Sequence, residues 1–247
     1  MLVGGVLFLP FLIAALPVPS RVWPFVLASA VLMIGYYAAL GYAYERGDFS
    51  LVYPIARGTA PALIATWAAL FLGERPSLRG LGGIGVILLG LVVLGGGPLW
   101  AHRAEWRRYT GGLGPAVVVA FLISVYSVVD GAGVRHWEPV PYIVLTFTLA
   151  GAVLVPGLWI RDATRVRKVL ASSWPSVIVI AALTLLAYSL VLRAYQIAPI
   201  AYAGAAREIG IVFAALAGWL LLRERFGPLR TAGALLVFLG IGILAGA

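Results

Sequence analysis

Cysteine is absent from this chain of 247 residues. Disulfides, thiolate metal sites and a cysteine nucleophile are therefore excluded. Histidine is scarce as well, since only His102 and His136 occur and both fall in predicted loops. The sequence contains neither a His-Glu-x-x-His motif nor a Gly-x-Ser-x-Gly motif. Nothing pairs a nucleophile with a base, so we expect no catalytic residue, no metal, no cofactor and no enzyme activity.

Charged residues are also scarce in this chain. Charged residues make up 11% of the chain and hydrophobic residues 62%, with a mean hydropathy of +1.03, whereas soluble domains have about 25% charged residues. The net charge of +9 comes mostly from arginines in short segments between apolar runs, where they act as topology signals. Because no basic patch carries interleaved aromatic residues, nucleic acid is not an expected partner.

The apolar runs are long enough to cross a bilayer, and they lack the alternation of barrel strands. We therefore predict an all-α polytopic membrane protein, multi-pass in the cell (inner) membrane of a bacterium. Nine transmembrane helices are visible, at about 1–18, 23–45, 49–73, 79–97, 114–134, 140–160, 174–195, 199–222 and 228–246. The longest polar segments, 100–110 and 161–173, are predicted to connect helices.

The chain contains an internal repeat. At an offset of 150 residues, segment 56–94 matches 206–244 at eleven positions, where composition alone would give roughly four. The matches include three charged residues, Arg57, Glu74 and Arg75, whose counterparts are Arg207, Glu224 and Arg225.

In this register, the second to fourth spans correspond to the seventh to ninth. We therefore predict an inverted repeat of five-helix units, with the first unit truncated to four helices. The first repeat covers 1–97, a polar connecting loop covers 98–112, and the second repeat covers 113–247. Either the chain starts downstream of the true start of a ten-helix protein, or it is a nine-helix variant. Inverted repeats are typical of transporters, with the substrate site near the midplane between the repeats.

The segment DFSLVYPIARGTAPALIATWAALFLGERPSLRGLGGIGVILLGLVVL, at 48–94, resembles the last two helices of an EamA repeat of the drug/metabolite transporter superfamily. The pattern is a helix ending in Gly-Glu-Arg followed by a Gly-rich helix, and the second half repeats it as LLRER. YSVVDGAGVR, at 126–135, resembles the first helix of that family's second repeat. The resemblance implies a ten-helix fold with a central cavity and the export or uptake of small organic solutes.

Arg57 and Arg207 are the principal substrate-binding candidates. Each lies eight residues inside its predicted helix, which places it about 12 Å deep at about 1.5 Å per residue. An arginine at the bilayer centre costs at least about 2.5–3.5 kcal/mol, so such residues usually face the protein interior, water or a partner. If both face the cavity, they form an anion clamp; snorkelling or structural pairing is the alternative.

Two neighbouring charges leave alternatives open. Glu208 directly follows Arg207, and consecutive helical positions point about 100° apart. Glu208 is therefore expected either to couple proton movement or, as the slightly favoured interpretation, to pair with Arg193 on the neighbouring helix. Arg193 lies near a helix end, where it can line the cavity or snorkel.

Asp130 and several tyrosines complete the candidates. Asp130, near the end of its span, is either an interfacial acid or a carboxylate that titrates or binds a substrate amine. Tyr37 and Tyr188 occupy matched, deep positions and are cavity candidates, whereas Tyr44 and Tyr195 fit the interfacial aromatic belt.

Other repeated features are expected to be structural. Pro54 and Pro61 bracket Arg57 and predict a bend in the first copy. The Glu-Arg pairs at 74–75 and 224–225 are expected at helix ends. The glycine-rich runs at 80–97 and 233–246 are expected to be helix-packing faces.

Together these features predict a secondary transporter that exports a small organic metabolite, for which an anion is one candidate class, by alternating access of two inverted repeats. The alternative is a lipid-linked carrier or flippase subunit on the same fold. The expected partners are a small-molecule substrate, membrane lipid and a coupling proton or counter-solute, for a monomer or homodimer. Orientation stays open, because eleven loop charges against four favour an external C-terminus, while the resemblance implies a cytoplasmic one.

Overall fold

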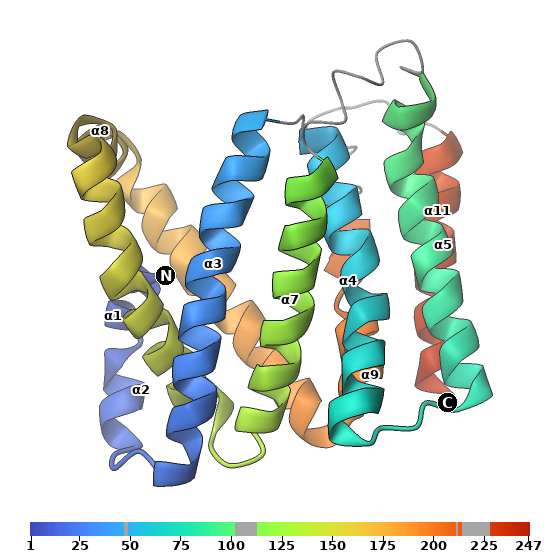
Figure 1. Cartoon of the computed structure of the whole chain (residues 1–247), viewed down its shortest axis with the longest axis horizontal. Coiled ribbons are helices and arrows are strands. Elements are labelled where there is room, and N and C mark those ends of the chain that lie inside the picture. The colour runs from blue at the N-terminus through green and yellow to red at the C-terminus, as the bar shows by residue number, and fades with distance from the viewer. Residues whose placement is uncertain (47–48, 102–112, 211, 214–227) are drawn as a thin grey trace. The chain divides into compact units, whose positions relative to one another are not determined.

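The structure is a computed structural model that describes residues 1–46, 49–101, 113–210, 212–213 and 228–247. Within these ranges every regular element is helical and no strand occurs. Figure 1 shows the helices, which are α1 (Leu2–Leu7), α2 (Leu9–Ala14), the short 3₁₀ helix η1 (Ser20–Val22), α3 (Trp23–Arg46), α4 (Phe49–Leu72), α5 (Leu78–Ala101), α7 (Leu113–Gly133), α8 (Pro139–Ile197), α9 (Ile200–Ala206) and α11 (Pro228–Ala245). The prediction of an all-α fold is confirmed.

Several of these helices suit a membrane. Three helical segments in the described ranges are long and apolar enough to cross one, namely Ser20–Glu45, Gly114–Gly133 and Pro139–Ile197. Shorter apolar helices cover Ala56–Leu72, Leu78–Val93 and Thr231–Ala245. These lengths agree with a multi-pass membrane protein.

The helices form two compact units, each built from two stretches of chain. Unit 1 comprises Met1–Gly35 and Val129–Ile197, and unit 2 comprises Tyr36–Val128 and Ala198–Ala247. Their boundaries fall within α3 and α7. Each unit therefore combines residues from both halves of the sequence, while the predicted repeat boundaries stay a prediction.

The predicted first span is not one helix. It is divided into α1 and α2 at Phe8, whose backbone leaves the helical region. Pro10 lies in the first turn of α2, where its missing N–H breaks no helical hydrogen bond. In a continuous helix the same ring would clash with the preceding turn, so proline accounts for the division.

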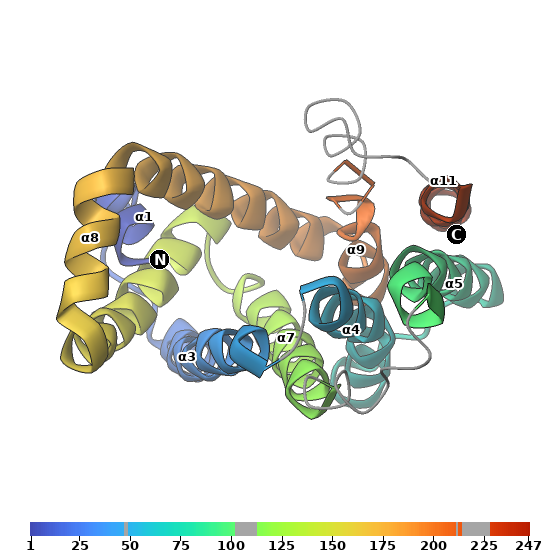
Figure 2. The same ribbon diagram turned by 90° about the horizontal axis from the view of Figure 1, so that it is seen from above.

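The polar segment 161–173 is helical rather than a loop. Helix α8 runs for 59 residues and turns at two residues with non-helical backbone angles, Asp162 and Ser173. Its first arm precedes Asp162, its third arm follows Ser173, and the arms turn relative to one another, as Figure 2 shows. The Asp162 carboxylate accepts a hydrogen bond from the backbone N–H of Arg165 at 2.9 Å, which caps the middle stretch.

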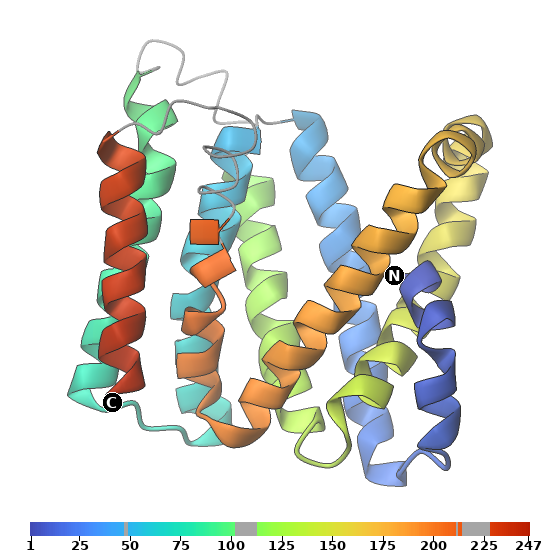
Figure 3. The same cartoon turned by 180° about the vertical axis from the view of Figure 1, so that it is seen from behind.

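The glycine-rich helices α5 and α11 pack against each other in unit 2 (Figure 3). A Cβ added at Gly90 would lie 2.8 Å from the Gly233 carbonyl oxygen, and one at Gly240 would lie 2.8 Å from that of Gly83. Only residues without a Cβ allow such a close backbone approach. The prediction that these glycines form packing faces is confirmed.

Glu74 has the structural role expected of the Glu-Arg pair. Its two carboxylate oxygens accept hydrogen bonds from the backbone N–H groups of Ile200, at 2.8 Å, and Ala201, at 3.1 Å. These are the first residues of α9, and N–H groups at a helix start have no partner within the helix. Glu74 therefore caps a helix 126 residues away in sequence. The matching pair at 224–225 lies outside the described residues.

Candidate functional site

Unit 2 gathers three of the predicted charged residues into one cluster, which we call the arginine cluster: Arg57, Arg207, Glu208 and the hydroxyl of Ser127. Arg57 lies on α4, Ser127 lies on α7, and Arg207 and Glu208 directly follow α9. Arg57 and Arg207 come from matched positions of the sequence repeat. Their proximity is a fact of the structure, whereas substrate binding by them stays a prediction.

The backbone after α9 explains how adjacent residues join one cluster. The N–H of Glu208 donates to the carbonyl of Ala205 at 3.1 Å, and the N–H of Gly210 donates to that of Arg207 at 3.3 Å. These bonds span three residues, as in a 3₁₀ helix, instead of the four of an α-helix. The helix is interrupted at Arg207 and Glu208. Their side chains can therefore meet, which a regular α-helix would oppose.

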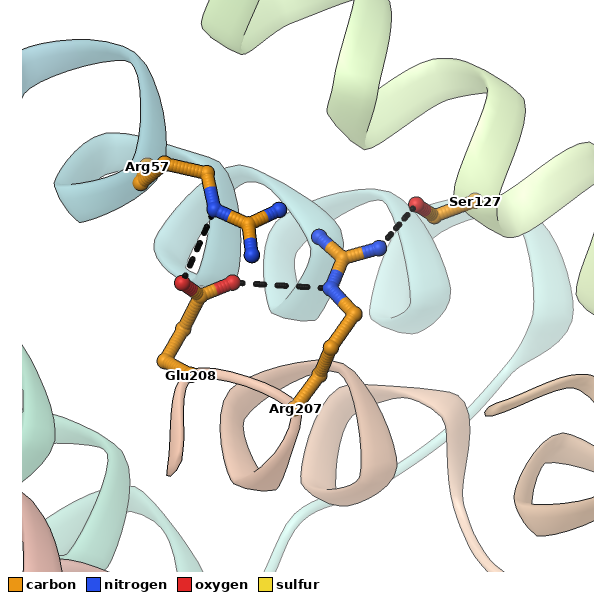
Figure 4. A network of polar contacts seen from close by, with 4 residues as sticks. All are labelled: Arg57, Ser127, Arg207 and Glu208. Atoms are coloured by element: carbon orange, nitrogen blue, oxygen red, sulfur yellow. Dashed lines mark hydrogen bonds and ion pairs between the residues drawn. The ribbon is translucent and has the colours of Figure 1, made fainter. Parts of the chain in front are cut away.

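The Glu208 carboxylate lies between the two guanidinium groups, as Figure 4 shows. One of its oxygens, Oε2, is 3.4 Å from Nε of Arg57, and the other, Oε1, is 3.4 Å from Nε of Arg207. Nη1 of Arg207 also donates to the Ser127 hydroxyl at 3.2 Å. A single carboxylate is thus shared by two arginines.

The cluster is buried, and its formal charges do not cancel. The Glu208 side chain is 0% exposed, that of Arg207 is 9% exposed and that of Arg57 is 25% exposed. Two guanidiniums and one carboxylate sum to +1. A buried charge is tolerated where opposite charges compensate it, and Glu208 compensates part of the charge of the two arginines.

Aromatic side chains adjoin the cluster within unit 2. Tyr126, next to Ser127 on α7, is buried and close enough to interact electrostatically with Arg57 and Arg207. Tyr36 contacts Tyr126 edge-to-face, with ring centroids 5.6 Å apart, and contacts Tyr37 at 4.8 Å. Tyr37, a predicted cavity residue, is therefore linked to the arginine cluster through two other tyrosines.

Unit 1 holds a second polar group, which we call the aspartate cluster: Asp130, Tyr142 and Tyr188. Asp130 is 0% exposed, so its carboxylate packs inside unit 1 and does not face solvent. Its Oδ1 accepts a hydrogen bond from the Tyr142 hydroxyl at 2.9 Å, and its Oδ2 accepts one from the Tyr188 hydroxyl at 2.6 Å. The predicted need of Tyr188 for a deep partner is met by Asp130.

The sequence was also compared with known proteins. The family model described as "EamA-like transporter family" matches residues 1–96 and 111–246, which is nearly the whole chain. The chain belongs to the EamA-like transporter family.

Solved structures support the fold of this EamA-like transporter. One described as "Crystal structure of protein" has a TM-score of 0.76 at 20% sequence identity, and the match covers 98% of this chain and 85% of that one. At this identity the likeness shows a shared fold. A comparison with curated proteins found no match.

Two sequence-based interpretations concern residues of unit 1. Glu208 forms ion pairs with Arg57 and Arg207, and Arg193, in unit 1, is exposed and donates to Gln196 at 2.6 Å. The favoured pairing of Glu208 with Arg193 would join the two units and stays a prediction. Tyr195 is 1% exposed, so it packs inside the protein instead of in an aromatic belt.

The bend predicted from the prolines around Arg57 stays a prediction. Helix α4 is assigned without interruption over Phe49–Leu72, through Pro54 and Pro61. The interruption lies instead in the second copy, at Arg207, where no proline occurs. Neighbouring contacts can satisfy the carbonyls that proline frees in a membrane helix.

Several residues of this EamA-like transporter escaped sequence reasoning. Ser127, Tyr126 and Tyr142 have the common side chains of apolar helices, and no spacing marks them. A weak signal existed for Tyr126 and Ser127, which lie four and three residues before Asp130 in YSVVDGAG. The described residues contain no group of three or more His, Cys, Asp or Glu that could hold a metal ion.

Proposed function

We propose that this chain is a secondary transporter for a small organic anion, and that Arg57 and Arg207 bind the anionic group. The observation that carries the proposal is the sharing of one carboxylate, Glu208, by two arginines from matched positions of the repeat. A substrate anion would bind the two guanidiniums in place of Glu208. The arginines would bring this contact from both repeats, as alternating access requires.

The donor geometry suits carboxylates, phosphates and phosphonates. A guanidinium presents five N–H donors in a planar fork and keeps its charge at any physiological pH. Each arginine engages Glu208 through Nε, one of those five donors. Bidentate contacts from the Nη groups are the usual way in which arginine binds a planar or tetrahedral anion.

Glu208 acts in this proposal as an internal counterion that the substrate replaces. Its contacts of 3.4 Å are longer than the roughly 2.7–2.9 Å of close charge-assisted hydrogen bonds. Contacts of this length can be exchanged at modest cost. When the substrate leaves, Glu208 returns to the arginines and limits the penalty of two uncompensated buried charges.

The proposal is tested by counterflow in proteoliposomes that contain the purified chain. The labelled probes are a monocarboxylate, a dicarboxylate, a phosphate monoester and a phosphonate, with an uncharged sugar as the negative probe. We expect flux of at least one anion class and none of the sugar. Arg57→Ala and Arg207→Ala should each lower that flux by at least about tenfold, since a lost charged contact is worth about 1.5–3 kcal/mol.

The matched control is Arg193→Ala, because Arg193 is exposed and lies outside the arginine cluster. We expect its anion flux to equal that of the unmodified chain. Equal flux in all three variants would show that the arginines do not bind substrate. Movement of a fluorescent lipid without any anion flux would favour a flippase instead.

A further inference from the structure

We propose that Asp130 is a proton-binding site that couples transport to a proton, and that its two tyrosine contacts report its protonation to both arms of α8. The inference rests on the proposed transport function, but not on the anionic substrate or on the arginine cluster. It begins from the burial of Asp130, an ionisable side chain in an apolar helix that is 0% exposed.

Burial makes a merely structural role expensive. A carboxylate inside a membrane protein is costly, and such residues commonly mark ion pathways and proton relays. The two hydroxyl donors, Tyr142 and Tyr188, reach separate oxygens of Asp130 at 2.9 and 2.6 Å. Hydrogen bonds of this kind favour the charged form, whereas burial favours the neutral form. Opposed influences on one carboxyl group are what a reversible proton site requires.

The two tyrosines connect Asp130 to different parts of α8. Tyr142 belongs to the first arm, before the turn at Asp162, and Tyr188 belongs to the third arm, after the turn at Ser173. Both hydroxyls donate to the same carboxylate on α7. The charge of Asp130 therefore influences how both arms pack against α7 within unit 1.

The backbone near Asp130 is shaped for this contact. A Cβ added at Gly133 would lie 2.7 Å from Cε2 of Tyr142 and 2.8 Å from its hydroxyl oxygen. Real Cβ atoms do not approach so closely, so a glycine is required for the Tyr142 ring to lie against α7. The last turn of α7 thus provides both the acceptor, Asp130, and the space for its donor.

The other titratable groups of unit 1 lie mainly on α8 and in the segment before it. Helices α1 and α2, and the part of α3 within unit 1 (Trp23–Gly35), carry no ionisable side chain. Arg135, His136 and Glu138 lie between α7 and α8, and all three are exposed. In α8, the first arm contributes Tyr142 and, at its end, Arg161, and the third arm contributes Tyr188 and, farther along, Arg193 and Tyr195. Tyr195 is buried, and Arg193 is exposed and donates to Gln196.

Protonation changes the direction of one hydrogen bond. The ionised carboxylate accepts from both hydroxyls, but a neutral carboxyl group carries one O–H donor. The tyrosine that faces this O–H must then accept instead of donate, and its own proton must be redirected to another acceptor. The hydrogen bond between that arm of α8 and α7 is kept with its direction reversed, and the redirected tyrosine proton converts the binding of one proton into a local rearrangement.

The first test measures proton binding directly and needs no substrate. Infrared difference spectra of the purified full chain in lipid nanodiscs are recorded while the pH is lowered. We expect a carboxylic-acid C=O band that grows on acidification and is absent from Asp130→Asn. The matched control is Asp162→Asn, since Asp162 carries the same carboxyl group on α8 and its cap to Arg165 can also be made by asparagine. This control should keep the band.

Two milder variants cover the case in which Asp130→Asn does not fold. Tyr188→Phe and Tyr142→Phe each remove one donor to the ionised carboxylate. The midpoint at which the band appears should therefore move to higher pH in each. A band that persists in Asp130→Asn, or a midpoint that neither phenylalanine variant shifts, would overturn the proposal.

The second test separates coupling from transport itself. A pH gradient is imposed on proteoliposomes that contain the anion found by counterflow. The unmodified chain should accumulate this anion against its gradient, and Asp130→Asn should exchange it without accumulation. Accumulation that persists in Asp130→Asn would refute proton coupling by Asp130, whereas the absence of any anion exchange in the unmodified chain would refute the proposed function. The infrared test of proton binding by Asp130 does not depend on either of these transport results.

Discussion

At the residue scale, the arginine cluster shows how one carboxylate can serve two cations. Glu208 is 0% exposed and lies 3.4 Å from a nitrogen of each arginine, so it lowers the cost of placing both guanidiniums inside the protein. It also competes with any anion for the same donors. The same side chain therefore stabilises the cluster and opposes substrate binding.

This opposition predicts a split between affinity and turnover. Glu208→Gln raises the formal charge of the cluster from +1 to +2 and removes the competing anion. We expect the anion identified by counterflow to bind about tenfold more tightly, which corresponds to about 1.4 kcal/mol, and to be released more slowly. Isothermal titration and counterflow measure the two effects. The control is Glu138→Gln, an exposed carboxylate of unit 1, and weaker binding in Glu208→Gln would contradict the role given to Glu208.

Sequence reasoning found the charged residues of the site better than their partners. The depth of Arg57 and Arg207 in apolar runs marked them out, because charge in such a run is conspicuous. The interruption at Arg207 was invisible, since no glycine or proline marks it, and the regular-helix assumption therefore separated Glu208 from Arg207. Hydroxyl partners such as Ser127 carry no charge or spacing signal and could only be found from coordinates.

At the element scale, the composition of the sequence predicted where helices begin and end. It did not predict how the helices are arranged. The predicted start at 23 is observed at Trp23, and the predicted ends at 73 and 246 are observed at Leu72 and Ala245, because charged or Pro- or Gly-rich residues mark these limits. Segment 161–173 is helical, although it is polar. A polar sequence indicates that a segment does not lie in an apolar environment. A helix outside the membrane can be as polar as a loop, so polarity alone does not distinguish the two.

The cap of α9 by Glu74 leads to a stability prediction. Glu74→Ala leaves the N–H groups of Ile200 and Ala201 without these acceptors, and we expect a loss of about 2 kcal/mol in the free energy of unfolding. Thermal unfolding in detergent measures the effect as a lower Tm. Glu74→Gln keeps one acceptor oxygen and should lose about half as much. An unchanged Tm in Glu74→Ala would mean that the cap adds nothing to stability.

At the scale of the whole molecule, the compact units do not follow the order of the chain. Unit 1 joins Met1–Gly35 to Val129–Ile197, and unit 2 joins Tyr36–Val128 to Ala198–Ala247. Duplication in sequence is therefore a poor guide to which residues pack together. The repeat correctly indicated which residues correspond, but contacts between the two halves depend on packing that correspondence alone does not specify.

The mixed composition of the units predicts how fragments behave. Fragments 1–101 and 113–247, expressed separately, each contain only part of both units and should aggregate on purification in detergent. Co-expressed, they should copurify and give a single peak in size-exclusion chromatography. The uncut chain is the control for the elution position. A stable, monodisperse fragment obtained alone would show that one repeat is self-sufficient.

The reach of Glu74 across 126 residues also has a consequence for synthesis. Helices enter the membrane in the order in which the ribosome makes them, so α4 is inserted long before Ile200 exists. During that interval the Glu74 carboxylate has no helix start to cap, and unit 1 still lacks its whole second stretch. Insertion and folding are thus separated in time, and the early helices must persist in the bilayer as independent spans until translation has passed Ile200.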